Sequence, residues 1–356
     1  MSMSKYYPWT ASPLIASAPM RLIALAPLAV AVSRAGGLGF IGAGTDVTDL
    51  DDYLQEAAEL LKESPIEGAT GDTLPIGVGF INWGANIDVA IDAVRKYKPA
   101  AVWFFAPKKN TDLDQWTRRS REATGGRTRI WVQVGTVSDA VEIAQICNPD
   151  VLVVQGTDGG GHGLQHGAGI ITLLPEVADA LSEAGHRDIR LIAAGGITEG
   201  RGLAAALALG AEGVSMGTRF LACREAYIAK GYQDDVIRMK DGGLNTVRSN
   251  VYDTLRGTAG WPAHYSARGI INQSYLDARE GGVTDENKKL YVEALKKGDR
   301  GWGEQGRLTA YAGTGVGLIK AIKSAREILD EVKSTAARIQ SSLSQGNTQS
   351  RNSEFL

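Results

Sequence analysis

Cysteine is scarce in this chain, and long apolar runs are missing. The two cysteines, Cys147 and Cys223, are too few for a disulfide framework and form no CxxC pair, which favours a reducing, cytoplasmic compartment. No apolar run reaches the length of a membrane-spanning helix. The apolar stretch 22–32 is interrupted by Pro27 and no convincing cleavage site follows it, so we do not interpret it as a signal peptide.

An excess of charge of one sign is also absent. The 38 basic and 40 acidic residues give a net charge of −2, which offers no electrostatic case for binding nucleic acid or an anionic membrane. No group of histidine, cysteine and aspartate residues has metal-ligand spacing, so we predict no metal site. At 356 residues, the chain can bury a large core as one big α/β domain or two smaller ones.

Glycine, by contrast, is abundant, and its densest run follows a strand. Residues 151–155 form an apolar, β-branched run typical of a strand buried on both faces. Residues 156–163 then contain five glycines and His162. Glycine lets the backbone approach a flat or anionic group closely, because no Cβ stands in the way. Since α/β folds place chemistry at strand ends, we predict that His162 is catalytic.

Strand-like and helix-like segments alternate between residues 13 and 226. The expected strands are 13–18, 38–41, 74–80, 100–105, 129–134, 151–155, 189–194 and 213–216. The expected helices are 22–35, 49–62, 87–96, 113–122, 137–146, 173–183 and 202–209. This alternation is typical of right-handed βαβ units with a parallel sheet. Eight such units predict an α/β protein of the (β/α)8 TIM-barrel type.

A dinucleotide-binding fold is the less favoured interpretation. Residues 37–42 match GxGxxG, but they follow a helix and contain a strand. A dinucleotide fingerprint follows a strand and opens a helix.

The alternation stops after Ala226. Residues 227–311 are richer in charge and aromatics, show no apolar strand, and look helical at 290–297. We therefore expect a mostly helical insertion that covers the C-terminal mouth of the barrel as a lid. The barrel would comprise 13–226 and 312–333, closed by a helix over 318–332. The Ser/Gln/Asn-rich residues 334–356 read as a disordered tail.

Two glycine-containing turns follow the last two expected strands. Gly195 and Gly196 precede one helix, and Gly217 and Thr218 precede another. Helix N-termini present unpaired N–H groups and the positive end of the dipole, so a phosphate could bind between the two turns. The alternative is that these glycines only make tight turns. Barrels commonly bind phosphate after strands seven and eight, which favours the phosphate.

The motifs together resemble the nitronate monooxygenases, formerly called 2-nitropropane dioxygenases. They are Ala18–Met20, Ala35–Gly39, Gln155–His162, Ala194–Ile197 and Met216–Phe220. The resemblance covers residues 13–332 and implies a TIM barrel that binds FMN and oxidises alkyl nitronates with O2 to carbonyl compounds and nitrite.

The resemblance also implies roles for individual residues. His162 would be the catalytic histidine beside the flavin. The expected cofactor contacts are the phosphate-binding Gly195, Gly196, Gly217 and Thr218, the ring-lining Ala18, Pro19, Met20 and Gln133, and in addition Gly160, Gly161 and Met216.

Three departures leave the substrate open. The family usually has Glu-Ala where Asp158 and Gly159 stand, and its late Ala-Gly-Gln reads Ala-Gly-Thr at 312–314. Asn82 is displaced from the usual Gly-Val-Asn, so its role is open, as are those of His166 and His264.

Other activities remain alternatives at this point. A flavin-dependent enoyl reductase, or another NAD(P)H-dependent FMN oxidoreductase, would share this barrel and its loops. A barrel that binds FMN without turnover is a third option. We expect a small-molecule nitronate and O2 as partners, with no nucleic acid and no membrane, and leave open whether the chain forms a homodimer.

Overall fold

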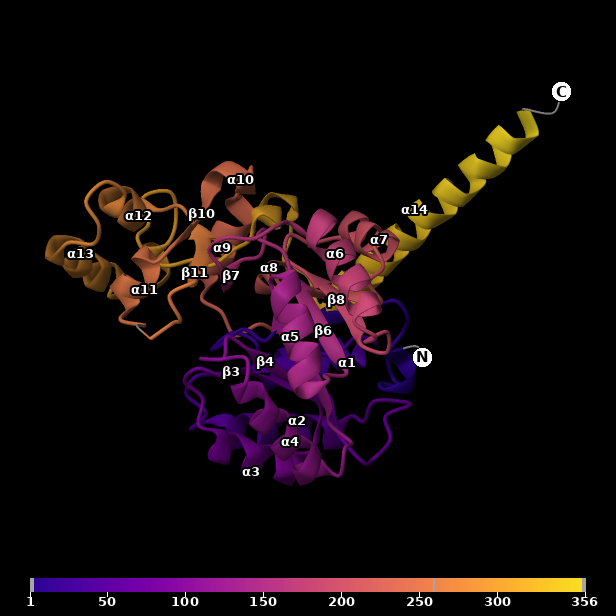
Figure 1. Ribbon diagram of the computed structural model, residues 1–356. Helices are drawn as coiled ribbons and strands as arrows, with labels where there is room; N and C mark the ends of the chain where they lie inside the picture. The colour runs from indigo at the N-terminus through magenta and orange to yellow at the C-terminus, as the bar shows by residue number, and fades with distance from the viewer. Residues whose placement is uncertain (1–2, 259, 354–356) are drawn as a thin grey trace.

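The computed structural model describes residues 3–258 and 260–353, and its centre is a barrel of eight parallel strands (Figure 1). The strands are β1 (Leu14–Ser17), β2 (Phe40–Gly44), β3 (Leu74–Ile81), β4 (Pro99–Phe105), β5 (Arg129–Val134), β6 (Val151–Gln155), β8 (Arg190–Ala194) and β9 (Gly213–Met216). They pair in the order β1-β9-β8-β6-β5-β4-β3-β2. A bridge between Ala16 and Leu38 joins the two end strands. The predicted (β/α)8 barrel is confirmed.

Helices surround the barrel (Figure 1). They are α1 (Ala26–Arg34), α2 (Leu50–Glu63), α3 (Ile87–Tyr97), α4 (Asp112–Thr124), α5 (Val137–Cys147), α6 (Ile170–Glu183) and α7 (Gly200–Ala208). The long α14 (Ala325–Ser353) packs against α7 and α1. Each of these helices turns a buried apolar stripe to the sheet, as amphipathic helices of βαβ units do.

Aromatic side chains fill the interior of the barrel. Phe40, Trp103 and Trp131 pack with ring centroids 5.1–5.7 Å apart, and the N-terminal segment adds Tyr7 and Trp9. The indole Nε1 of Trp131 donates to the hydroxyl of Tyr7 over 2.7 Å, so this buried polar pair is satisfied. These rings make the barrel interior a packed core, as in other TIM barrels.

The first helix begins later than the sequence predicts. Helix α1 starts at Ala26 rather than at residue 22, with Pro27 in its first turn. Leu22 has a φ of 65°, a left-handed backbone that cannot continue a helix. The segment between β1 and α1 instead turns over the end of the barrel, where a Cβ on Gly42 or Gly79 would collide with Met20 or Pro19.

The insertion is mostly helical, as expected, but it also contains two short strands. Strands β10 (Thr246–Ser249) and β11 (Tyr265–Ile270) form an antiparallel sheet with β7 (Gly161–Leu164), in the order β10-β11-β7. The glycine-rich stretch expected to be a loop therefore contributes a strand. The sheet was missed because its strands are short and carry arginine and glycine instead of an apolar run. Helices and turns form the remainder of the insertion: α9 (Lys230–Arg238), α10 (Gly242–Asn245), α11 (Val251–Arg256), α12 (Gln273–Ala278), α13 (Asp285–Leu295) and η2 (Gly298–Gly301). The short α8 (Thr218–Leu221) precedes the insertion and η3 (Thr314–Leu318) follows it.

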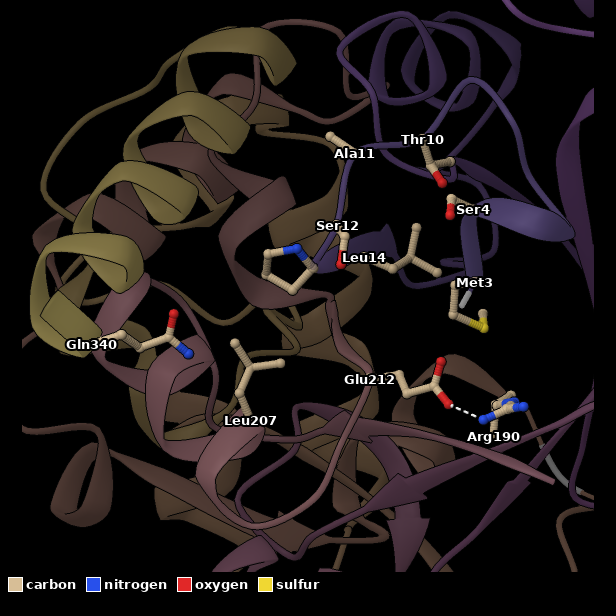
Figure 2. A pocket seen from close by; sticks show the side chains of 11 residues that line it. Met3, Ser4, Thr10, Ala11, Ser12, Leu14, Arg190, Leu207, Glu212 and Gln340 are labelled. Carbon is tan, nitrogen blue, oxygen red and sulfur yellow. Dashed lines mark hydrogen bonds and ion pairs between the residues drawn. The ribbon is translucent and has the colours of Figure 1, made fainter. Parts of the chain in front are cut away.

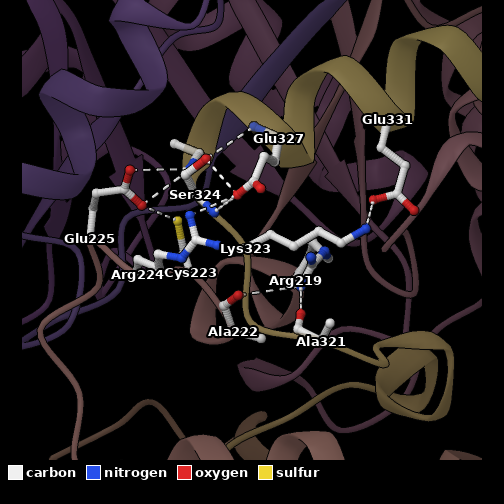
Figure 3. A network of polar contacts seen from close by, with 11 residues as sticks. Arg219, Ala222, Cys223, Arg224, Glu225, Ala321, Lys323, Ser324, Glu327 and Glu331 are labelled. Atoms are coloured by element: carbon white, nitrogen blue, oxygen red, sulfur yellow. Dashed lines mark hydrogen bonds and ion pairs between the residues drawn. The ribbon is translucent and has the colours of Figure 1, made fainter.

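The last helix begins at Ala325 instead of residue 318, and polar contacts hold its first turn (Figure 3). Ser324 and Glu327 bond each other's backbone N–H groups as a capping box. The carboxylate of Glu225 accepts from the N–H of Ala325 and from the thiol of Cys223. These contacts fasten the helix to the segment that follows β9.

The tail expected to be disordered from residue 334 continues α14 to Ser353. Ala336 is buried and Ile339 packs against the core, so an apolar stripe holds the start of this region on the barrel. Figure 1 shows the distal part of α14 extending away from the body. Residues 354–356 lie outside the described part. Within the described part, no helix is long and apolar enough to cross a membrane.

Candidate functional site

A cavity of about 1080 Å³ lies between the C-terminal ends of the barrel strands and the insertion. Nine of the predicted residues line it, and they come from the ends of different strands: Ala18, Pro19, Met20, Gln133, Gly160, Gly161, His162, Gly217 and Thr218. The opposite wall comes from the insertion and includes Arg256, Trp261, Trp302 and Tyr311. TIM-barrel enzymes have their active sites at this end of the barrel.

Three predicted cofactor residues are not in the cavity wall. Met216 is fully buried in the core. Gly195 and Gly196 have left-handed backbones, with φ of 96° and 78°, and pack behind the loop 156–160. A Cβ on Gly196 would lie 3.0 Å from that of Asp158, whose carboxylate accepts from the Thr314 hydroxyl. Of the two turns predicted to bind the phosphate, only the one with Gly217 and Thr218 therefore lines the cavity.

His162 is held in the cavity wall by residues of the insertion. It lies on β7, opposite Ala267 of β11. Its ring stacks on Trp261, with centroids 3.6 Å apart and planes 7° from parallel. Its Nε2 lies 3.0 and 2.9 Å from the two carboxylate oxygens of Asp253. The His162 and Asp253 side chains are 14% and 11% exposed, so the contact is largely removed from water.

Two hydroxyl groups hold the carboxylate of Asp253 in turn. Thr258 Oγ1 and the phenol of Tyr311 both donate to Asp253 Oδ1, over 2.9 and 3.2 Å. Burial, and then the negative charge of Asp253, raise the pKa of Tyr311 above its usual range. Tyr311 therefore keeps its proton at neutral pH and remains a donor. The arrangement is a hydrogen-bonded chain from the insertion to His162.

A second chain of side chains runs along the barrel ends. Trp103 Nε1 donates to Gln133 Oε1 over 3.2 Å, and Gln133 Nε2 donates to Gln155 Oε1 over 2.8 Å. Gln155 Nε2 then reaches the carbonyl of His162 at 3.5 Å. The predicted Gln133 thus lines the cavity and also orients Gln155, which belongs to the same wall.

The ionisable side chains of the cavity wall include arginines and a histidine. Arg21, Arg256 and His162 line the cavity, and no carboxylate side chain does so in the part of the chain that the structure describes. Arg256 lies over the ring of Tyr311, 5.4 Å from its centroid. Low-dielectric walls of one sign of charge concentrate ligands of the opposite sign, so this cavity suits an anion.

The other candidate residues lie elsewhere. His166 and His264 are exposed and do not line the cavity. Asn82 is buried directly after β3, and its Oδ1 accepts from the N–H of Phe105 at the end of β4 over 2.8 Å. Its position in the fold is thus beside the strand ends, outside the cavity wall.

A smaller cavity of about 520 Å³ lies where the N-terminal segment meets α7 and α14 (Figure 2). Its lining includes an ion pair between Arg190 and Glu212, 2.7 Å apart. None of the predicted site residues lines it. Among residues 3–258 and 260–353, no group of three or more histidine, cysteine, aspartate and glutamate side chains could hold a metal ion.

Asp253, Trp261 and Tyr311 were not predicted as site residues. Their contacts with His162 depend on how the insertion folds back onto β7, and no local motif marks them. Only the cluster of aromatics around 261–265 draws attention in the sequence, and there His264 stands out, although its neighbour Trp261 makes the contact.

Comparison with known proteins places the chain in a family. Residues 80–334 match the family model described as nitronate monooxygenase. The chain is 51% identical to nitronate monooxygenase npaC of Metarhizium robertsii, with 96% of each chain covered. It is 36% identical to a nitronate monooxygenase of Neurospora crassa, with 94% of this chain and 92% of the relative covered.

Among solved structures, FabK from Thermotoga maritima superposes with a TM-score of 0.73 at 25% identity, covering 96% of this chain and 98% of that one. The barrel fold, the family model and the two relatives lead to the same assignment. The chain belongs to the nitronate monooxygenase family of oxidoreductases.

Proposed function

We propose that this protein uses FMN, bound in the large cavity, to oxidise alkyl nitronates with O2 to carbonyl compounds and nitrite. The observation that carries the proposal is His162, held in the cavity wall by Asp253 and Trp261. We further propose a cytoplasmic location, with a small-molecule nitronate and O2 as the partners.

The residues at one end of the cavity support FMN as the cofactor that we propose. Gly217 lines the cavity, and having no side chain it lets a ligand come close to its backbone. The hydroxyl of Thr218 accepts from the N–H of Gly313 over 3.0 Å, which leaves its own proton to donate. We place the phosphate here, since backbone N–H and hydroxyl groups are its usual donors.

The other residues of the predicted cofactor site follow from this placement. Ala18, Pro19, Met20 and Gln133 would contact the flavin ring, and Gly160 and Gly161 would allow its close approach. Gly195 and Gly196 pack against the loop 156–160, and we propose that they affect phosphate binding only through that loop. When bound, the flavin supplies electron acceptance and the reaction with O2.

The charge of the wall supports an anionic substrate. A nitronate is an anion with its carbon already deprotonated, so it needs no strong base. Arg21 and Arg256 would favour its entry. His162 can orient the nitro oxygens of a nitronate, or take the α-proton of a neutral nitroalkane, because an imidazole is suited to both roles near pH 7.

An anaerobic spectrum of the purified protein tests this function. We expect a yellow protein whose flavin is bleached by a nitronate without any nicotinamide. Admitting air should restore the colour while O2 is consumed and nitrite appears. Bleaching by NADH or NADPH alone would indicate a reductase of the enoyl reductase type. A colourless protein that binds no added FMN would refute flavin chemistry altogether.

A further inference from the structure

We propose that Asp253 is a positioning residue that keeps a proton on Nε2 of His162 and leaves Nδ1 as the nitrogen that accepts the substrate proton. The inference rests on the proposed function, since it requires His162 to act as a base. It assigns to the insertion a part in the chemistry besides covering the cavity.

The geometry determines which nitrogen carries the proton. Both oxygens of Asp253 lie within 3.0 Å of Nε2 of His162. An ionised carboxylate can only accept hydrogen bonds, so Nε2 must donate. A neutral imidazole then carries its lone pair on Nδ1, for which no hydrogen-bond partner is found among the described residues. The carboxylate thereby selects the tautomer, as an aspartate does for the histidine of a serine protease triad.

The imidazole is also held against rotation. The ring of Trp261 covers one face of His162 at 3.6 Å between centroids. The backbone of His162 is fixed by its pairing with Ala267 and by the amide of Gln155 at its carbonyl. A base held in one orientation can meet a substrate proton without first losing rotational freedom.

The two oxygens of Asp253 have different surroundings. Thr258 and Tyr311 both donate to Oδ1, whereas Oδ2 makes the shorter contact, 2.9 Å, with Nε2 of His162. In Asp253→Asn, the amide oxygen should therefore stay with the two hydroxyl donors. The NH2 group would then take the place of Oδ2 and face Nε2. Because two donors cannot face each other, the proton of His162 must move to Nδ1, which removes the base.

The tautomer can be measured in the unaltered holoenzyme. The chain has 4 histidines, so ¹⁵N-histidine labelling gives a simple NMR spectrum. The signals of His162 are those that disappear in His162→Asn. We expect a protonated Nε2 and an unprotonated Nδ1. A proton on Nδ1 of His162 in the neutral form would overturn the proposal, whether or not any variant of Asp253 folds.

Kinetics then test the consequence. With a neutral nitroalkane, Asp253→Asn should lower kcat by about 10²–10⁴-fold, the range for a lost base or a wrong tautomer. With the preformed nitronate, kcat should fall by less than about 10-fold, and FMN should stay bound. The matched control is Asp235→Asn, a buried aspartate of the same insertion that pairs with Arg238. It should leave the ratio of the two substrates unchanged.

The double variant separates this inference from the proposed function. If Asp253 acts through His162, then His162→Asn with Asp253→Asn should be no slower than His162→Asn alone. Losses that multiply, or an unchanged substrate ratio in Asp253→Asn, would overturn the positioning role. If His162→Asn itself spares the neutral substrate, the base function assigned to His162 fails instead.

Discussion

Gly217→Val tests where the flavin phosphate binds without disturbing the fold. Gly217 has φ −102° and ψ −68°, a backbone that any residue adopts. Its new Cβ would make ordinary contacts of 3.6 and 3.9 Å with Ala18 and Met20. Gly196 is a poorer choice, since at φ 78° any side chain is strained whatever the ligand does. A valine at 217 should therefore fold, while its methyl groups occupy the proposed phosphate position.

The size of the effect follows from the hydrogen bonds that would be lost. A hydrogen bond to a charged group contributes about 1.5–3 kcal/mol. Displacing the phosphate from one such donor should weaken FMN binding by roughly 10- to 150-fold, at about 1.4 kcal/mol for each factor of ten. The loss of a second donor would multiply this factor. The unfolding midpoint of the apoprotein should barely change, because the backbone of Gly217 suits any residue and a Cβ there makes only ordinary contacts.

Fluorescence titration of the apoprotein with FMN measures this loss. Gly71→Val is the matched control, since a Cβ at Gly71, in the turn before β3, meets no atom within 4 Å. It should bind FMN as tightly as the unaltered protein. Unchanged affinity in Gly217→Val, or equal losses in both variants, would refute the placement of the phosphate.

Three further outcomes are expected. His162→Asn should keep its FMN yet lose about 10²–10⁴-fold in turnover of a neutral nitroalkane, and steady-state assays would contradict this if activity stayed near normal. Tyr7→Phe leaves the buried Nε1 of Trp131 without its acceptor, so urea unfolding should show a loss of about 1–3 kcal/mol. Burial raises the pKa of Cys147 to about 11 from 9.0, and burial with the Glu225 contact raises that of Cys223 further. Both thiols of the native protein should therefore resist iodoacetamide at pH 8. The free energy of unfolding should keep the contribution of protonated Cys147 below pH 9 and lose it as the pH rises from 9 towards 11, because the thiol ionises first in the unfolded chain.

The barrel could be predicted because its signals are local. A fully buried parallel strand needs an apolar run, and 151–155 and 129–134 each supply one between turn residues. The residues that follow each strand arrive at the same end of the sheet by topology alone. That rule brought Ala18, Gln133, His162 and Gly217 into one cavity wall from separate segments.

The remainder depends on contacts that no local pattern records. Strand β11 carries Arg268 and Gly269 and alternates only weakly, so its pairing with β7 is invisible in the sequence. Helix α14 continues beyond residue 334 because Ala336 and Ile339 pack against the core, although the composition there is typical of disorder. In both cases tertiary packing outweighs local propensity.

The surroundings of His162 differ from those that its local sequence predicts. Its glycine neighbours predict an open, unburied histidine, yet the side chain is 14% exposed and stacks on Trp261. Its carboxylate partner, Asp253, is 91 residues away in sequence and belongs to the insertion. A histidine on the barrel alone would have neither a selected tautomer nor a fixed ring. If His162 is the base that we propose, the insertion contributes through Asp253, Trp261 and the hydroxyl donors together, since coverage of the cavity without them would leave His162 without a fixed orientation.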